Sequence, residues 1–197
     1  MHNSYRLALA ISQAALGATQ CRYPFPEIKF MRLLVWKERE TQVKQGVKAS
    51  SAGQLLRSYC LPFMKGVFMD FYSSAAKLQP TSSKALAQIL SHTHVVEEQE
   101  LFTIEEILSD RRLDPLDQDN RIDHAQVGDL NGHRALAIEW TDGYRNCKRI
   151  SVYLDGREDG TMVQEIQFSA PLEAFDVAKK YFSEALRSLQ WQECQVC

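Results

Sequence analysis

The most regular pattern of apolar and polar positions lies in residues 125–191, where it predicts strands followed by a helix. Two extended runs, 125–130 and 133–140, flank the dipeptide Asn131-Gly132. Asn-Gly is the strongest short-range signal for a two-residue hairpin turn, because both central residues need a positive φ. The pattern therefore predicts an antiparallel hairpin centred on this dipeptide.

Large apolar side chains recur at alternating positions in three successive runs. They are Leu136, Ile138 and Trp140; Ile150, Val152 and Leu154; and Met162, Ile166 and Phe168. Alternation of this kind predicts an antiparallel meander that packs on one side. Ala137, Tyr153 and Val163 lie among the polar positions, so the opposite face is either solvated or partly covered.

An amphipathic helix is predicted after the segment Ser169-Ala170-Pro171. Serine is a typical N-cap, and proline is accepted in the first turn because its missing N–H has no partner there. The apolar positions then recur at helical spacing, at Phe175, Ala178, Phe182, Leu186 and Leu189. We expect this helix to cover the apolar face of the sheet.

The first half of the chain is patterned less clearly. Residues 29–37 predict a strand with an apolar centre, and residues 67–72 predict another. Residues 54–60 indicate the start of a helix that Pro62 limits. The polar segment 38–54 predicts a loop or a hairpin tip.

Two further elements are predicted before the hairpin. Pro80 introduces apolar positions at helical spacing up to Leu90. Thr103 and Glu106 have the spacing of a capping box, which predicts a second helix start at that point. Residues 110–124 predict an acidic loop that contains a proline.

Length and composition are those of one globular domain with an extension. The 197 residues are 45% hydrophobic and 10% aromatic, enough for a sizeable core. We expect an N-terminal helical extension over residues 1–25, a single α+β domain over 26–191 and a flexible tail over 192–197. No run approaches the ~18 apolar residues of a membrane-spanning helix.

Charge is distributed unevenly along the chain. Residues 1–50 hold eight Lys/Arg and three Asp/Glu, a net of +5, and the remainder carries −7, which gives the total of −2. Three interpretations stay open for this basic start: a targeting segment, an arm for an acidic partner or a membrane surface, and chance. The acidic remainder argues against nucleic-acid binding.

The cysteines favour free thiols over a structural framework. Five are present, an odd number, and no secretory signal precedes them, which favours a reducing cytoplasmic or organellar compartment. Cys194 and Cys197 form a C-x-x-C motif that follows the C-terminal end of a helix. A helix N-terminus would lower a thiol pKa, so this is the wrong end for a redox pair.

His92 and His94 are the weak metal candidates. An H-x-H on a strand places two imidazoles on one face, here near Glu97, Glu98 and Glu100, and zinc accepts such ligands. The alternative is a solvated helix end, where cationic side chains are favoured.

Acidic side chains offer little recognisable chemistry. Asp117, Asp119 and Asp123 suggest a calcium loop, but an EF-hand needs glycine at the sixth position and glutamate at the twelfth, which are Ile122 and Gly128 here. Two carboxylate–histidine pairs, Asp123 with His124 and Glu139 with His133, are available for acid–base chemistry. Nothing in their spacing brings them together, so we expect no catalytic residue and no cofactor.

The C-terminal third resembles the PsbP/DcrB-like domains. The residues that carry the likeness are Asn131-Gly132 through Trp140, residues 150–154 and 163–168, Ser169-Ala170-Pro171, and the helix from Phe175 through Phe182 and Leu186 to Ser188-Leu189. The resemblance implies an α/β/α sandwich with a central antiparallel sheet. It also implies a mostly non-enzymatic role, as in photosystem subunits, assembly factors and chaperones, and a thylakoid association.

Two functional hypotheses follow. The first is a non-catalytic binding or accessory protein, such as an assembly factor, chaperone or adaptor, that docks a protein partner. It predicts an exposed apolar patch without convergence of polar groups. The alternative is an enzyme or small-ligand carrier with a pocket between the sheet and the N-terminal helices, with His92, His94 or Asp123 at its rim.

Overall fold

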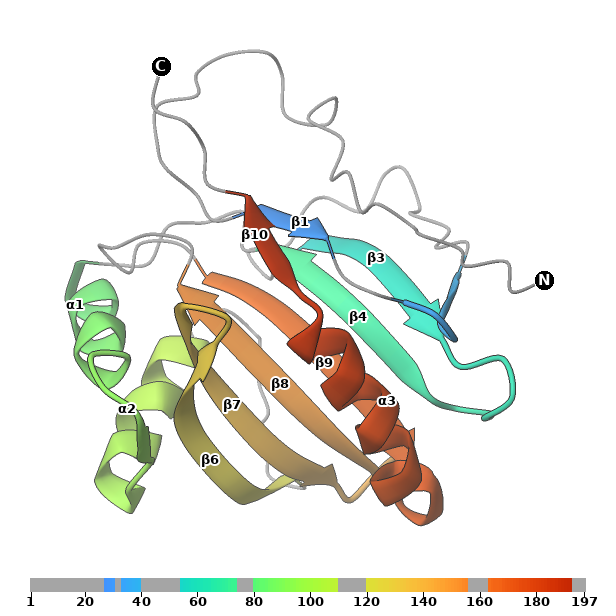
Figure 1. The fold of residues 1–197 in the computed structure, drawn as a ribbon. Helices are drawn as coiled ribbons and strands as arrows, with labels where there is room; N and C mark the ends of the chain where they lie inside the picture. The colour runs from blue at the N-terminus through green and yellow to red at the C-terminus, as the bar shows by residue number, and fades with distance from the viewer. Residues whose placement is uncertain are drawn as a thin grey trace.

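An eight-stranded antiparallel sheet with helices on both faces forms the centre of the protein (Figure 1). The computed structural model describes residues 27–30, 33–39, 54–73, 80–109, 120–155 and 163–192. The strand order is β2-β3-β4-β9-β8-β7-β6-β5, and β1 pairs with β10 as a separate ribbon. This architecture confirms the predicted α+β fold class with its α/β/α layers. The predictions for residues 1–25 and for Cys194 and Cys197 lie outside the described residues.

The elements follow in chain order, with three helices and ten strands in the described part of the chain. The strands are β1 (Glu27–Phe30), β2 (Lys37–Glu38), β3 (Gln54–Cys60), β4 (Phe68–Ser73), β5 (His94–Val95), β6 (Asn120–Leu130), β7 (His133–Asp142), β8 (Cys147–Asp155), β9 (Val163–Pro171) and β10 (Gln190–Gln192). The helices are α1 (Pro80–Ile89), α2 (Glu98–Ser109) and α3 (Phe175–Arg187), the last preceded by the 3-10 helix η2 (Leu172–Ala174).

The predicted hairpin joins β6 and β7. Asn131 has φ 53° and Gly132 has φ 92°, as a two-residue turn of this type requires. The ladder extends from Leu130↔His133 to Asn120↔Asp142. The predicted loop over residues 110–124 is therefore wrong for residues 120–124, because pairing with β7 holds these polar residues in a strand.

The α3 core fills the space between α3 and one face of the sheet. Phe168 on β9 is fully buried and stacks on Phe182 of α3 with ring centroids 4.9 Å apart. The other sheet residues of this core come mainly from the central strands: Met69 and Phe71; Ile150, Val152 and Leu154; Ile166 and Ala170. The predicted helix stripe is confirmed, with Phe175, Ala178, Phe182 and Leu189 buried and Leu186 partly buried.

The α1–α2 core lies on the opposite face. Leu86 and Ile89 of α1 and Ile104 and Ile107 of α2 cover Val127, Leu136, Ile138, Trp140 and Tyr153. The expectation of a meander packed on one side is thus wrong. The apolar positions of β7 point to the α1–α2 core and those of β8 and β9 to the α3 core, since paired residues share a face and Leu136 pairs with Tyr153 rather than Val152.

The predicted start of the C-terminal helix is wrong. Ser169 does not cap it, because the strand β9 continues to Pro171, with Ser169 paired to Phe68 on one side and Arg149 on the other. The 3-10 helix then turns the chain, and α3 begins at Phe175 without a side-chain cap.

Other helix and strand boundaries in the first half also differ from the predictions. Residues 54–60 form the strand β3, so the predicted start of a helix there is wrong. A short apolar run does not by itself distinguish a strand from a helix. Within 29–37, residues 29–30 and 37 lie in strands, whereas the described residues 33–36 do not, and Leu33 and Trp36 contribute to the α3 core. The predicted strand over 67–72 and the helix from Pro80 are confirmed.

Helix α2 begins ahead of the predicted capping box. Its start is at Glu98, so Thr103 lies inside the helix. The Glu97 backbone N–H donates to Glu100 Oε2 at 3.1 Å, the reach-back contact of an N3 glutamate. Glu100, not Glu106, is therefore the residue that marks this start. None of the helices in the described ranges is long and apolar enough to cross a membrane.

Candidate functional site

His92 and His94 lie together on the surface before α2. Their rings stack with centroids 4.3 Å apart, and His94 Nε2 lies 3.1 Å from both carboxylate oxygens of Glu100. A hydrogen bond with the His92 carbonyl, followed by the Glu100 carboxylate, raises the pKa of His94. Among the described residues no three His, Cys, Asp or Glu side chains form a group that could hold a metal ion. His94 thus links β5 to α2 through its hydrogen bond with Glu100.

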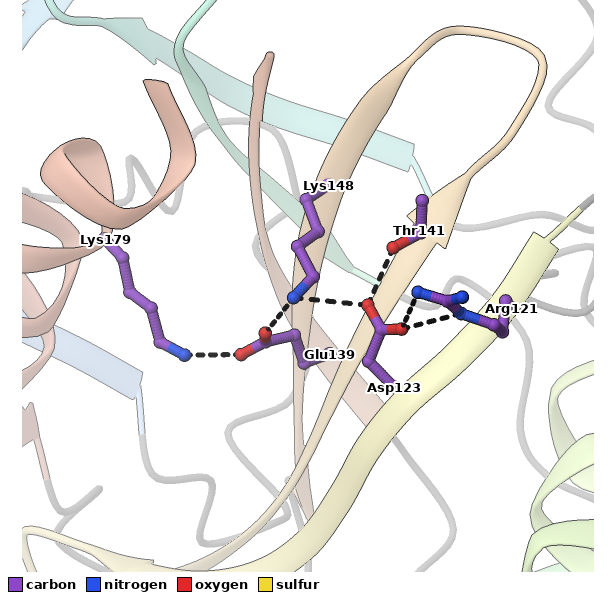
Figure 2. Close-up of polar contacts among 6 residues, drawn as sticks. All are labelled: Arg121, Asp123, Glu139, Thr141, Lys148 and Lys179. Carbon is purple, nitrogen blue, oxygen red and sulfur yellow. Dashed lines mark hydrogen bonds and ion pairs between the residues drawn. The ribbon is translucent and has the colours of Figure 1, made fainter. Parts of the chain in front are cut away.

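Asp123 lies in a charge network on the α3 face that joins its near neighbour Arg121 to the more distant Thr141 and Lys148 (Figure 2). Its Oδ2 accepts from Thr141 Oγ1 at 2.7 Å and lies 3.3 Å from Lys148 Nζ. Its Oδ1 accepts from Arg121 Nε at 2.9 Å. Both oxygens of this carboxylate therefore have donors among the described residues.

Glu139 continues the same network toward the helix (Figure 2). Lys148 Nζ donates to its Oε1 at 2.7 Å, and Lys179 of α3 donates to its Oε2. Both lysine ammonium groups also lie near the Phe175 ring, at 5.0 Å for Lys148 and 5.5 Å for Lys179. The network, defined as Arg121, Asp123, Glu139, Thr141, Lys148 and Lys179, fastens the first half of α3 to β6, β7 and β8.

Electrostatics keep this network ionised. Burial opposes the charge on Asp123 and Glu139, but hydrogen bonds from Thr141, Arg121 and Lys148 lower the pKa of Asp123, and those from Lys148 and Lys179 lower the pKa of Glu139. The same bonds raise the pKa of Lys148. Fully ionised pairs at partly exposed positions stabilise geometry and do not exchange protons near neutral pH. The pairing of Glu139 with His133, considered from the sequence, is replaced by these lysines.

The opposite face of the sheet carries a polar cluster around Glu165. This side chain is only 4% exposed, on β9 between Tyr72 of β4 and Tyr153 of β8. Gln167 Nε2 donates to Glu165 Oε1 at 3.3 Å. Burial raises the pKa of Glu165 to about 7, although hydrogen bonds from Ser151 and Gln167 oppose the shift. Glu165 is therefore a proton-binding group near neutral pH.

The Glu165 cluster extends across neighbouring strands. Arg149 Nη1 donates to Gln167 Oε1 at 3.3 Å, and its Nη2 donates to Asp142 at 2.8 Å. Burial also raises the pKa of Asp70, which lies opposite Gln167. Two buried atoms, Asp70 Oδ1 and Arg149 Nε, have no hydrogen-bond partner among the described residues.

Polar groups thus converge on this face, contrary to the expectation of an apolar surface without such convergence. Sequence analysis missed the cluster, because Glu165 and Gln167 occupy ordinary alternating polar positions of a strand. The available signal was Tyr153 and Val163 at neighbouring positions of the same face, which indicated that this face is covered.

An exposed apolar strip lies on the outer side of α3. Phe63, in the turn between β3 and β4, is 57% exposed, and Val177 on α3 is 53% exposed. Phe63 packs edge-on against Tyr181 with ring centroids 5.5 Å apart, and Val177 lies one helical turn before Tyr181. The exposed Phe63 and Val177, together with the partly buried Tyr181 between them, are named the α3 strip.

Two cysteines are described, and both are free thiols. Cys60 ends β3 and Cys147 opens β8. Asp117 and Asp119 of the calcium hypothesis lie outside the described residues. The Asp123 carboxylate interacts with Arg121, Thr141 and Lys148.

Comparison with known proteins finds likeness at the level of structure but not of sequence. Neither a protein-family model nor a curated protein matches the sequence. The solution structure of cyanobacterial PsbP (CyanoP) from Synechocystis sp. PCC 6803 is similar, with a TM-score of 0.44 and 10% identity over 80% of this chain and 82% of that one. A likeness of this degree says nothing about function, and the fold described above stands on its own sheet order and layers.

Proposed function

We propose that the chain is a non-catalytic binding protein that docks a protein partner on the α3 strip. The observation that carries this proposal is the exposure of Phe63 and Val177 beside Tyr181 on a helix whose other side is fully packed. Aromatic and aliphatic side chains at the surface of a rigid element are typical of the centre of a protein interface.

The helix that carries the α3 strip is held against the sheet near both ends and in its middle. Lys179 ties the first half of α3 to Glu139, and Asn131 Nδ2 donates to the Leu189 carbonyl at 2.6 Å beyond the other end of the helix. Phe182 holds the middle against Phe168. A surface that is already ordered loses little conformational entropy when it binds, which favours recognition by docking.

The charges beside the strip define the class of partner. Asp176, Lys180 and Glu184 are exposed along α3 and alternate in sign. A nucleic acid or an anionic membrane favours one continuous positive field, which this row does not provide. We therefore assign the strip to a protein segment with apolar side chains and a rim of both charges.

A cross-linking experiment in the native source tests the proposal. A photoreactive residue at position 177 is expected to capture one partner, and Val177→Lys or Phe63→Ser to abolish its co-purification. The matched control is position 102, because Phe102 is 67% exposed on α2, away from the strip. Retention of the partner by the Val177→Lys variant, or equal loss with Phe102→Ser, contradicts the proposal.

The Glu165 cluster favours a second candidate function, the carriage of a small polar ligand. Asp70 Oδ1 is an acceptor and Arg149 Nε a donor, and a hydroxyl or amide group satisfies both kinds of atom. This site lies on the sheet itself and does not involve His92 or His94.

A thermal-shift screen with polar metabolites, together with metal analysis of the purified chain, separates the two functions. The carrier function predicts a compound that raises the melting temperature of the wild type but not of Glu165→Gln or Asp70→Asn. A wild type that no compound and no metal stabilises removes this candidate and leaves the docking proposal in place.

A further inference from the structure

The Asn131-Gly132 turn does more than reverse the chain, because it also closes the C-terminal end of α3. Asn131 Nδ2 donates to the Leu189 carbonyl at 2.6 Å and lies 3.3 Å from the carbonyl oxygens of Leu186 and Arg187. The last carbonyls of a helix lack intrahelical partners and carry partial negative charge. One amide group from the distant hairpin thus satisfies a helix end that has no glycine C-cap.

The same dipeptide is the most reactive one for asparagine deamidation. Glycine has no side chain to hinder its backbone nitrogen, and that nitrogen can attack the Asn131 side-chain carbonyl carbon. The N–C bond forms, the bond to Nδ2 breaks, and ammonia leaves with the displaced proton. Water then opens the cyclic imide to aspartate or isoaspartate, so the only co-reactant is water.

Two hydrogen bonds of the native turn oppose the attack. The Gly132 N–H donates to Asp129 Oδ1 at 3.0 Å, which engages the nucleophilic nitrogen. The bond to the Leu189 carbonyl holds the Asn131 amide toward the helix, whereas the attack requires this side chain to rotate over its own peptide. Reaction therefore requires the end of α3 and the turn to separate first.

We propose that Asn131 is a deamidation site and that its hydrogen bonds to the C-terminal end of α3 protect it in the folded protein. Once Asn131 is deamidated, these hydrogen bonds cannot form again. The product carries a carboxylate in place of the NH2 donor. That carboxylate faces the carbonyl oxygens of Leu186, Arg187 and Leu189 at the negative end of a helix dipole. Transient opening is thereby converted into a permanent change, and the proposal does not depend on the proposed function.

Peptide mapping of the full chain during incubation at mildly alkaline pH tests the protection. Conversion of Asn131 is expected to be at least about tenfold slower in the folded protein than in urea, because it follows the open fraction. Asn146 is the internal control, since it also has a positive φ in a turn but precedes Cys147. Equal rates in folded and unfolded protein overturn the proposal.

Two variants test the two protecting bonds separately. Asp129→Ala frees the Gly132 N–H, and Leu189→Ala loosens the buried end of α3, so each is expected to accelerate conversion under native conditions but not in urea. Hydrogen exchange then compares Asn131→Asp with Asn146→Asp. Faster exchange at residues 186–189 in the first variant alone supports the proposal, and identical exchange in both contradicts it.

Discussion

The two faces of the sheet are apolar over different strands. Across the α3 face, one row of paired residues runs from Tyr59 and Met69 through Phe168 and Ile150 to Glu139. Across the opposite face, a row runs from Tyr72 and Glu165 through Tyr153 and Leu136 to Val127. The first row begins apolar and ends charged, and the second begins polar and ends apolar. Helix α3 thus covers one face over β3, β4, β9 and β8, and helices α1 and α2 cover the other face over β8, β7 and β6. Strand β8 is therefore buried on both sides.

Two glutamates at the polar ends of these rows have pKa values shifted in opposite directions. Glu139 lies where the α3 face becomes polar, and despite its partial burial two lysines lower its pKa. Glu165 lies where the other face becomes polar, and burial raises its pKa to about 7. The same side chain on neighbouring strands of one sheet thus has a lowered pKa in one place and a raised pKa in the other.

Removing the packing of the α3 face has the largest expected effect. Phe168→Ala deletes a fully buried ring that contacts Phe182 and Phe175, and we expect it to lower the free energy of unfolding by about 3–5 kcal/mol. Urea denaturation measures this loss. Leu136→Ala, in the α1–α2 core, is expected to cost about 2–5 kcal/mol, and a negligible cost there would show that the second core is not a stabilising layer.

Glu165→Gln tests the proton-binding side of the comparison. Because the folded pKa is raised, the native state binds the proton more tightly, and the contribution of Glu165 to stability falls as pH rises from its ordinary value of 4.5 to about 7. The variant is therefore expected to be more stable than the wild type at pH 8 by about 2–3 kcal/mol, and nearly equal to it at pH 4. Urea titrations at the two pH values measure the difference. A variant no more stable at pH 8 than at pH 4, relative to the wild type, contradicts the assignment.

Lys148→Met tests how much the charge network around Asp123 and Glu139 contributes to stability. It removes the cation shared by Asp123 and Glu139 while keeping an apolar stem beside Phe175. We expect a loss of about 1–2 kcal/mol at pH 7, reduced by salt because the network is partly exposed. The lowered carboxyl pKa values stabilise the wild type above the unfolded values, and this contribution disappears as pH falls below about 4. The wild type and the variant should therefore converge in acid, and a constant difference would point to lost packing instead.

The smallest expected effect on stability belongs to the α3 strip. Val177→Lys is expected to change the free energy of unfolding by less than about 0.5 kcal/mol, because the side chain is mostly exposed. Thermal and urea unfolding of this variant beside Phe102→Ser supply the measurement. A large loss with Val177→Lys would mean that the strip belongs to the core and that its exposure is not available for a partner.

Local sequence signals predicted the elements that depend on local chemistry. Asn131-Gly132 fixed a turn because of its backbone preferences, and the spacing from Phe175 to Leu189 fixed a helix stripe. The strand β3 and the start of α2 were not predicted correctly, since a short apolar run fits either element and Thr103-to-Glu106 spacing also occurs inside helices. Neither candidate surface was predicted by residue, because each combines residues distant in sequence.

The sequence by itself determined an antiparallel α+β protein with a C-terminal helix on its sheet, because alternation and helical periodicity are properties of consecutive residues. Only the tertiary structure decided which helix covers which face of which strand. That choice depends on register: Leu136 pairs with Tyr153 and Ala137 with Val152, so the apolar sides of neighbouring strands point in opposite directions. Register also places Glu139 beside two lysines and Glu165 in a buried cluster, and this difference in surroundings gives two identical side chains opposite pKa shifts.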